Sequence, residues 1–100
     1  MKVILSSTAK SSLKEIIEFL KVKWTEKEIA VMKNDIKKFK QIMKDGIIKH
    51  PTVDGFPNLK YSLIGNNQVK IYYSIEDGEV LIRLFWHCKK DPIKMKELLK

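Results

Sequence analysis

The stretch Phe85-Trp86-His87-Cys88-Lys89-Lys90-Asp91-Pro92 joins the end of an apolar strand to the start of a helix. The strand, Val80 to His87, is rich in branched and aromatic residues, which pack well on a pleated surface. Asp91 and Pro92 are an N-cap and a first-turn proline, a pair that opens helices. The stretch therefore predicts a last strand followed directly by a short C-terminal helix, whose apolar residues are Ile93, Leu98 and Leu99.

Two more strands precede the last one, and turn residues separate all three. Leu59 to Ile64 is followed by Gly65-Asn66-Asn67, and Val69 to Ile75 is followed by Glu76-Asp77-Gly78. Asn and Asp-Gly are the residues that tight hairpins require. The pattern predicts a three-stranded antiparallel meander. The connector over residues 50–58 holds two prolines and a glycine, which exclude a central strand or a helix there.

A short strand over residues 2–5 and two amphipathic helices come first. Ser6, Ser7 and Thr8 offer N-caps to one helix, and Thr25-Glu26-Lys27-Glu28 matches the capping box of the next, which ends at Lys44-Asp45-Gly46. Their apolar stripes consist of Leu13, Ile16, Ile17, Leu20 and Trp24, and of Ile29, Met32, Ile36, Phe39 and Met43. We predict a single two-layer α+β domain over residues 1–100: strand, helix hairpin, three-stranded antiparallel meander and short C-terminal helix.

The composition indicates the cellular compartment and the kinds of partner to expect. The chain carries 20 Lys and Arg against 12 Asp and Glu, a formal charge of +8, which favours polyanions or an acidic protein partner. One cysteine excludes an internal disulfide, and with no apolar run of membrane-spanning length we predict a cytoplasmic protein. Two histidines and one cysteine fall short of a four-ligand zinc site, so we expect no metal and no cofactor.

Strict alternation along the strands predicts which side chains share the outer face of the sheet. Along each strand of the meander, one of the two alternating series of side chains is mainly apolar. If that series faces the helices, the opposite face of the sheet carries Lys60, Ser62, Lys70, Tyr72, Arg83 and His87. Lysines beside an aromatic ring suit phosphate contact and base stacking, although a solvated outer face has the same composition. Leu81 and Phe85 would be exposed on that face, so we expect the C-terminal helix or a partner to cover part of it.

The element order and the last strands resemble the RelE/ParE superfamily of type II toxin–antitoxin toxins, in particular its plasmid stabilization branch. That branch ends its last strand in Phe-Trp-x-x-Arg-x-Asp-Pro, which Phe85 to Pro92 follow except for Lys89 in place of arginine. The strand Lys70-Ile71-Tyr72-Tyr73-Ser74-Ile75 is similar to its basic-apolar-apolar-Tyr-x-Ile strand, and Phe56-Pro57 matches a Phe-Pro step.

The resemblance implies a toxin that a small antitoxin neutralises by wrapping the sheet and the helix hairpin. RelE-like members are ribosome-dependent mRNA endoribonucleases, which is the activity we expect. The resemblance leaves two alternatives: a ParE-like inhibitor of DNA gyrase without chemistry of its own, and a degenerate relative that only binds its antitoxin.

The expected site follows from the outer face and the resemblance together. We assign catalysis to His87, Arg83 and Lys89, and nucleic-acid binding to Lys60, Lys70, Tyr72 and Lys90. Histidine titrates near neutral pH and can serve as acid or base, while cations stabilise the charged phosphate. The match is partial, because Lys70 and Lys89 replace arginines of the RNase pattern, and lysine lacks the bidentate fork. The C-terminal helix also has no tyrosine or histidine.

Overall fold

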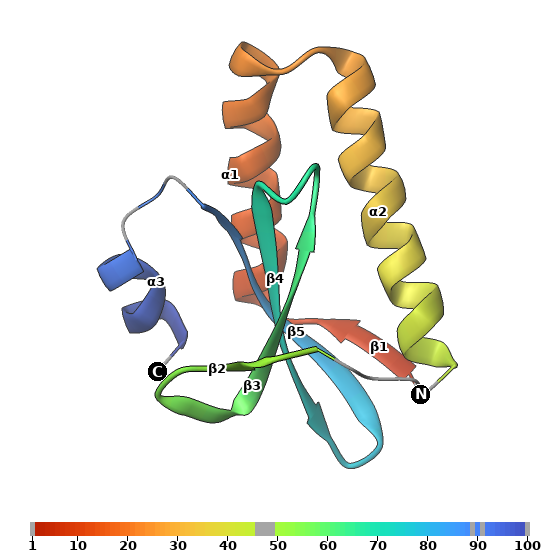
Figure 1. Cartoon of the computed structure of the whole chain (residues 1–100), viewed down its shortest axis with the longest axis vertical. Coiled ribbons are helices and arrows are strands. Elements are labelled where there is room, and N and C mark those ends of the chain that lie inside the picture. Colours follow the sequence, from red (N-terminus) through yellow and green to blue (C-terminus); the bar gives the residue numbers. More distant parts are fainter. Residues whose placement is uncertain (1, 46–49, 89, 91, 100) are drawn as a thin grey trace.

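The computed structural model describes residues 2–45, 50–88, 90 and 92–99 (Figure 1). In chain order the elements are β1 (Lys2–Leu5), α1 (Ser7–Lys23), α2 (Glu26–Lys44), β2 (Thr52–Val53), β3 (Phe56–Ile64), β4 (Val69–Glu76), β5 (Glu79–His87) and α3 (Pro92–Leu99). They form one sheet in the order β1-β5-β4-β3-β2, in which β1 runs parallel to β5 and the other pairs are antiparallel. The predicted α+β class and element order are confirmed.

The connector before the meander contains strand that the sequence did not predict. The two residues of β2 pair with β3, which begins at Phe56 rather than Leu59. The turn between them passes through Gly55 at φ 81°, a left-handed conformation that glycine adopts without strain. Pro51 precedes the edge strand β2 and Pro57 is the second residue of β3, positions at which a proline disturbs the ladder little.

Both long helices begin at the predicted caps. The Ser6 hydroxyl accepts the Ala9 N–H at 3.0 Å. Thr25 and Glu28 form the complete capping box of α2. Helix α1 ends at Lys23 and Trp24 is its C-cap, but Trp24 packs against the same apolar core as the rest of the predicted stripe. The predicted caps at Gly46 and Asp91 lie outside the described residues.

Two apolar cores lie on opposite faces of the sheet. The hairpin core, between the sheet and α1 with α2, is built around Ile16, Leu20, Met32, Ile36, Phe39, Met43, Ile71, Tyr73, Ile82 and Phe85. The α3 core, on the other face, consists of Leu59, Tyr72, Leu84, Trp86, Met95 and Leu99. Helix α3 therefore covers part of the outer face, which is the first of the two possibilities, helix or partner, that the sequence left open.

A β-bulge in β5 breaks the alternation on which the outer face was predicted. Tyr73 pairs with Ile82 and Tyr72 pairs with Leu84, which leaves Arg83 as the extra residue. Val80 and Ile82 face the hairpin, but beyond the bulge Leu84 and Trp86 face α3. The prediction that these four side chains share one face was wrong.

Beyond the bulge, serine hydroxyls at the start of α1 form hydrogen bonds with the edge of β5 that is not paired with β1. Strand β1 pairs only with Glu79 to Ile82. The Ser12 hydroxyl accepts the Phe85 N–H at 3.0 Å, and the Ser6 hydroxyl donates to the Arg83 carbonyl at 3.2 Å. These bonds satisfy backbone groups that a bulge leaves unpaired. They also fix the end of β5 next to the first turns of α1.

Candidate nucleic-acid interface

One part of the α3 face pairs a lysine with a tyrosine ring. Lys70 on β4 places its Nζ 5.0 Å from the ring centroid of Tyr61 on β3. The Tyr61 ring lies 6.3 Å from that of Tyr72, centroid to centroid. Lys70 and Tyr61 are both partly exposed, so a cation and a ring are offered to solvent together. Such a pair can contact a phosphate and an adjoining base.

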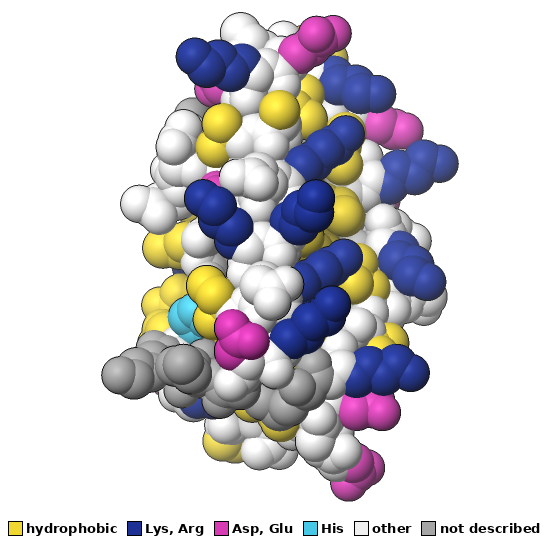
Figure 2. Space-filling model, turned by 90° about the vertical axis from the view of Figure 1, so that its right-hand side faces the viewer, with side chains coloured by type: hydrophobic (Ala, Val, Ile, Leu, Met, Phe, Trp, Pro, Cys, Tyr) yellow, Lys and Arg dark blue, Asp and Glu magenta, His cyan; other side chains and the backbone are white. Residues whose placement is uncertain are grey.

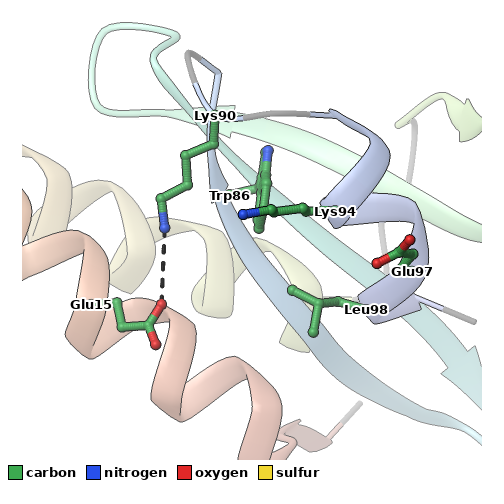
Figure 3. Close-up of a pocket in the computed structure, with 6 residues that line it drawn as sticks. All are labelled: Glu15, Trp86, Lys90, Lys94, Glu97 and Leu98. Carbon is green, nitrogen blue, oxygen red and sulfur yellow. Dashed lines mark ion pairs between the residues drawn. The ribbon is translucent and has the colours of Figure 1, made fainter.

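A second lysine–aromatic pair lies at the end of β5. The Nζ of Lys90 is 5.2 Å from the ring centroid of Trp86 and 3.9 Å from Glu15 Oε2 on α1. They border a hollow of about 560 Å³ lined by Glu15, Trp86, Lys90, Lys94, Glu97 and Leu98. Figure 3 shows Lys90 extending from the strand end toward Glu15, while Lys94 and Leu98 reach the same hollow from α3.

The aromatic rings beneath this face are only partly available. Tyr72 is 2% exposed and Trp86 is 7% exposed, because α3 packs over both. The Trp86 Nε1 is buried and has no hydrogen-bond partner among the described residues. Burial, and then the charges of Cys88 and Tyr61, raise the pKa of Tyr72 to about 12, so its hydroxyl stays protonated at neutral pH. With α3 in place, Tyr61 and the lysines form the accessible surface.

Lys60 lies on the hairpin face, not with Lys70. It pairs with Tyr73 across β3 and β4, whereas Lys70 pairs with Leu63. Its Nζ donates to the His50 carbonyl at 3.4 Å. The predicted gathering of Lys60 with Lys70 and Tyr72 was wrong, because the apolar residues of β3 that we placed on the core face, among them Leu59, belong to the α3 core.

His87 also lies on the hairpin face, as a consequence of the bulge. It pairs with Val69 of the hairpin core and is 3% exposed. Its ring meets that of Phe19 on α1 edge-on at 5.7 Å between centroids. It lines a hollow of about 300 Å³ with Phe19, Leu20, Lys23, Trp24 and Gln68. The structure therefore separates His87 from the Lys70 and Tyr72 side of the sheet, contrary to the prediction.

The remaining two catalytic candidates do not complete a site. Arg83 occupies the bulge and is half-buried, with its carbonyl held by Ser6. Lys89 lies outside the described residues. Of the predicted set, Lys70, Tyr72 and Lys90 are brought to the α3 side of β4 and β5.

Sequence reasoning missed Tyr61, Trp86 and Lys94, which border this surface. Alternation placed Tyr61 and Trp86 against the helices. A signal was available: Leu84-Phe85-Trp86 is a run of three apolar residues after an arginine, which strict alternation does not explain. Among the described residues, no three His, Cys, Asp or Glu side chains gather where they could hold a metal ion.

The described helices also lack any stretch with the length and hydropathy to cross a membrane. Comparison with known protein families, curated proteins and solved structures found no match for this chain.

Proposed function

We propose that this chain is a cytoplasmic RelE/ParE-like toxin that acts on RNA through the α3 face of its sheet. The observation that carries the proposal is the pair of lysine–aromatic contacts, Lys70 over Tyr61 and Lys90 over Trp86. Cations fixed beside rings suit a single-stranded RNA, which presents phosphates and unstacked bases together. The formal charge of +8 adds long-range attraction to the same target.

The reaction we propose is cleavage of mRNA on the ribosome. The groups that this chain contributes to the reaction are the ammonium groups of its lysines. Lys70 and Lys90 would stabilise the negative charge that develops on the phosphate when the 2′-hydroxyl attacks. His87 has no part in this proposal, because it lies on the opposite face of the sheet, against Phe19 of α1. The partner that restrains the activity is a small antitoxin, as the family resemblance implies.

A non-catalytic inhibitor of a target such as DNA gyrase is the second candidate. The observation that favours it is the burial of His87, the one imidazole of the predicted site, away from the α3 face. A surface of lysines and rings without an imidazole serves binding without requiring chemistry.

Induced expression followed by primer-extension mapping of transcripts tests the proposal. The wild-type chain should produce codon-phased cuts, and Lys70→Gln and Lys90→Gln should each reduce them by on the order of tenfold, since each removes one phosphate-stabilising charge. Lys60→Gln is the matched control: it removes the same charge from the opposite face and should leave cutting unchanged.

Other outcomes would contradict RNA cleavage. Double-strand breaks and an SOS response without phased cuts would establish the gyrase inhibitor. No growth effect in a host that lacks the antitoxin would identify a degenerate relative. Equal loss of cutting in the Lys60 and Lys70 variants would show that the α3 face is not the site.

A further inference from the structure

A hollow of about 220 Å³ lies between the second half of α2 and β3, and we call it the His50 hollow. Its polar lining consists of Asp35, Lys38, His50 and Ser62, and its apolar lining includes Phe39 and Ile64. Figure 2 shows the side of the molecule on which α2 lies, where a histidine is visible among hydrophobic side chains next to the lysines of the helix.

The imidazole of His50 is held in one orientation. Its Nδ1 lies 2.5 Å from the Tyr73 hydroxyl, with which it forms a hydrogen bond. The ring stacks on that of Phe39 at 6.0 Å between centroids, and the Tyr73 ring meets it edge-on at 5.6 Å. The Lys60 ammonium donates to the His50 carbonyl, which ties the backbone as well. A side chain fixed in this way loses little conformational freedom when it binds a ligand.

The second ring nitrogen of His50 points away from the core. The two nitrogens of an imidazole diverge, so with Nδ1 on the fully buried Tyr73, Nε2 turns outward. Burial raises the pKa of Tyr73 to about 12, so its hydroxyl keeps its proton and can donate to Nδ1. The neutral ring then carries its own proton on Nε2, which becomes a donor. Among the described residues Nε2 has no hydrogen-bond partner.

The charges around the hollow favour an anion once His50 is protonated. Lys38 forms no ion pair with another described residue, and Asp35 accepts the Gly65 N–H at 3.0 Å through Oδ2. The charges of Lys38 and Asp35 cancel, so protonation of His50 makes the lining positive. Burial and then the charge of Lys60 lower the pKa of His50. A bound anion would offset that repulsion, so anion and proton should each strengthen the binding of the other.

The size and the donors of the hollow narrow the class of ligand. A volume of 220 Å³ is below the range of about 300–1,000 Å³ that suits drug-sized ligands, so the occupant is small. Nε2–H, the Ser62 hydroxyl and the Lys38 ammonium can all donate, and an oxyanion offers the matching acceptors. A cation would instead meet the Lys38 ammonium and the Nε2 proton.

We infer that the His50 hollow binds a small oxyanion, a carboxylate or a phosphate, together with a proton on His50. The anion accepts hydrogen bonds from the imidazole, the Ser62 hydroxyl and the Lys38 ammonium. The Tyr73 hydroxyl can also accept, so it keeps its bond to the protonated ring. The inference goes beyond the action on RNA proposed for the α3 face and does not depend on it, because neither Lys70 nor Lys90 lines the hollow.

Nuclear magnetic resonance of the histidine rings tests the inference. The chain has two histidines, and His50→Gln identifies the signals of His50. Sodium acetate and sodium phosphate are titrated at pH 6 and constant ionic strength, with sodium chloride as the reference. The His50 signals should shift and saturate with acetate, phosphate or both, while the His87 signals stay in place. Saturation by acetate alone identifies a carboxylate ligand, and saturation by phosphate alone identifies a phosphate ligand.

The dependence on pH tests the coupling to the proton. Affinity for the preferred oxyanion should rise by on the order of tenfold between pH 7.5 and pH 5.5, because protonated His50 adds a positive charge beside the anion. Acetate stays ionised over this range, so its own titration does not contribute. With phosphate as the ligand, sulfate replaces it in this measurement as a tetrahedral dianion that does not titrate there.

Removal of charge at adjacent lysines locates the binding. Lys38→Gln should weaken oxyanion binding by on the order of tenfold, because Lys38 lines the hollow. Lys37→Gln removes the same charge from an exposed residue of the same helix, about 100° around its axis, and should leave binding unchanged. Ser62→Ala should weaken binding by a smaller factor, since it removes one uncharged donor. Circular dichroism should show all three variants folded, since neither lysine nor Ser62 is part of a core.

Four results would overturn the inference. Equal weakening by Lys37→Gln and Lys38→Gln would indicate attraction to net charge alone. An equal shift of the His50 signals in chloride would indicate a response to ionic strength. No saturable shift in either oxyanion, with a folded wild-type chain, would exclude the site, and binding that does not change with pH would exclude the proton on His50. Effects of Lys70→Gln on RNA cleavage bear only on the α3 face.

Discussion

At the scale of single residues, the hydrogen bond between Tyr73 and His50 ties the connector to the hairpin core. The Tyr73 hydroxyl lies 2.5 Å from His50 Nδ1. Burial raises the pKa of Tyr73 to about 12, so its hydroxyl is protonated and can donate. Burial and then the charge of Lys60 lower the pKa of His50 from 6.5, which favours the neutral, accepting imidazole. The sequence places His50 in the connector over residues 50–58 and does not reveal this contact, because Tyr73 is 23 residues away.

This arrangement makes the stability of the fold depend on pH. His50 has a lower pKa folded than unfolded, so the unfolded chain takes up its proton first as the pH falls below about 6.5. We expect the free energy of unfolding to decrease between pH 7 and pH 5 more in the wild type than in His50→Gln, as measured by urea denaturation. The carboxylates titrate in both proteins and cancel in the comparison. Parallel pH profiles would contradict this role of His50.

At the scale of elements, the bulge in β5 decides which side chains each face receives. Without it Leu81 and Phe85, four residues apart, would share a face. With Arg83 as the extra residue, Phe85 enters the hairpin core and is 0% exposed, while Leu81 remains partly exposed. The same shift moves Trp86 to the α3 core.

Alanine substitutions at these two positions measure the effect of the bulge. Phe85→Ala should lower the free energy of unfolding by about 3–5 kcal/mol, because it leaves a cavity in the hairpin core. Leu81→Ala should cost much less, since part of that side chain is already in water. Urea denaturation of both variants is the measurement. Similar losses at the two positions would mean that they share an environment and that the bulge is absent.

At the scale of the whole molecule, the two cores differ in the number of helices and strands that build them. The hairpin core draws on both long helices and on three strands, whereas the α3 core is closed by Met95 and Leu99 from an eight-residue helix. A helix of that length is not stable alone and depends on docking. The surface proposed to act on RNA therefore lies on the side of the sheet that fewer elements support, and undocking of α3 would expose Tyr72 and Trp86 there.

Substitutions of two adjacent leucines on α3 test whether the α3 core can open while the hairpin core stays folded. Leu99 is 4% exposed in the α3 core, while Leu98 is 53% exposed. Leu99→Asp should undock α3, since it buries a carboxylate without a partner, and Leu98→Asp should not. Hydrogen–deuterium exchange should show lost protection in α3 of Leu99→Asp, with α1 and β5 still protected. Global unfolding of Leu99→Asp would show instead that the two cores form one cooperative unit.

The sequence by itself determined the α+β class, the element order and the helix starts. These follow from local causes: the capping box at Thr25, turn residues after β3 and β4, and apolar stripes at helical spacing. Each depends on residues within one or two turns of one another. Such features therefore survive whatever the chain packs against.

Only the tertiary structure decided the faces of the sheet, and with them the candidate site. The bulge at Arg83 depends on the register between β4 and β5 and on serines of α1 more than seventy positions away in the sequence. One extra residue reverses every side chain beyond it. It is this reversal that turns His87 to the hairpin face, against Phe19, and places Trp86 beneath α3, next to Lys90.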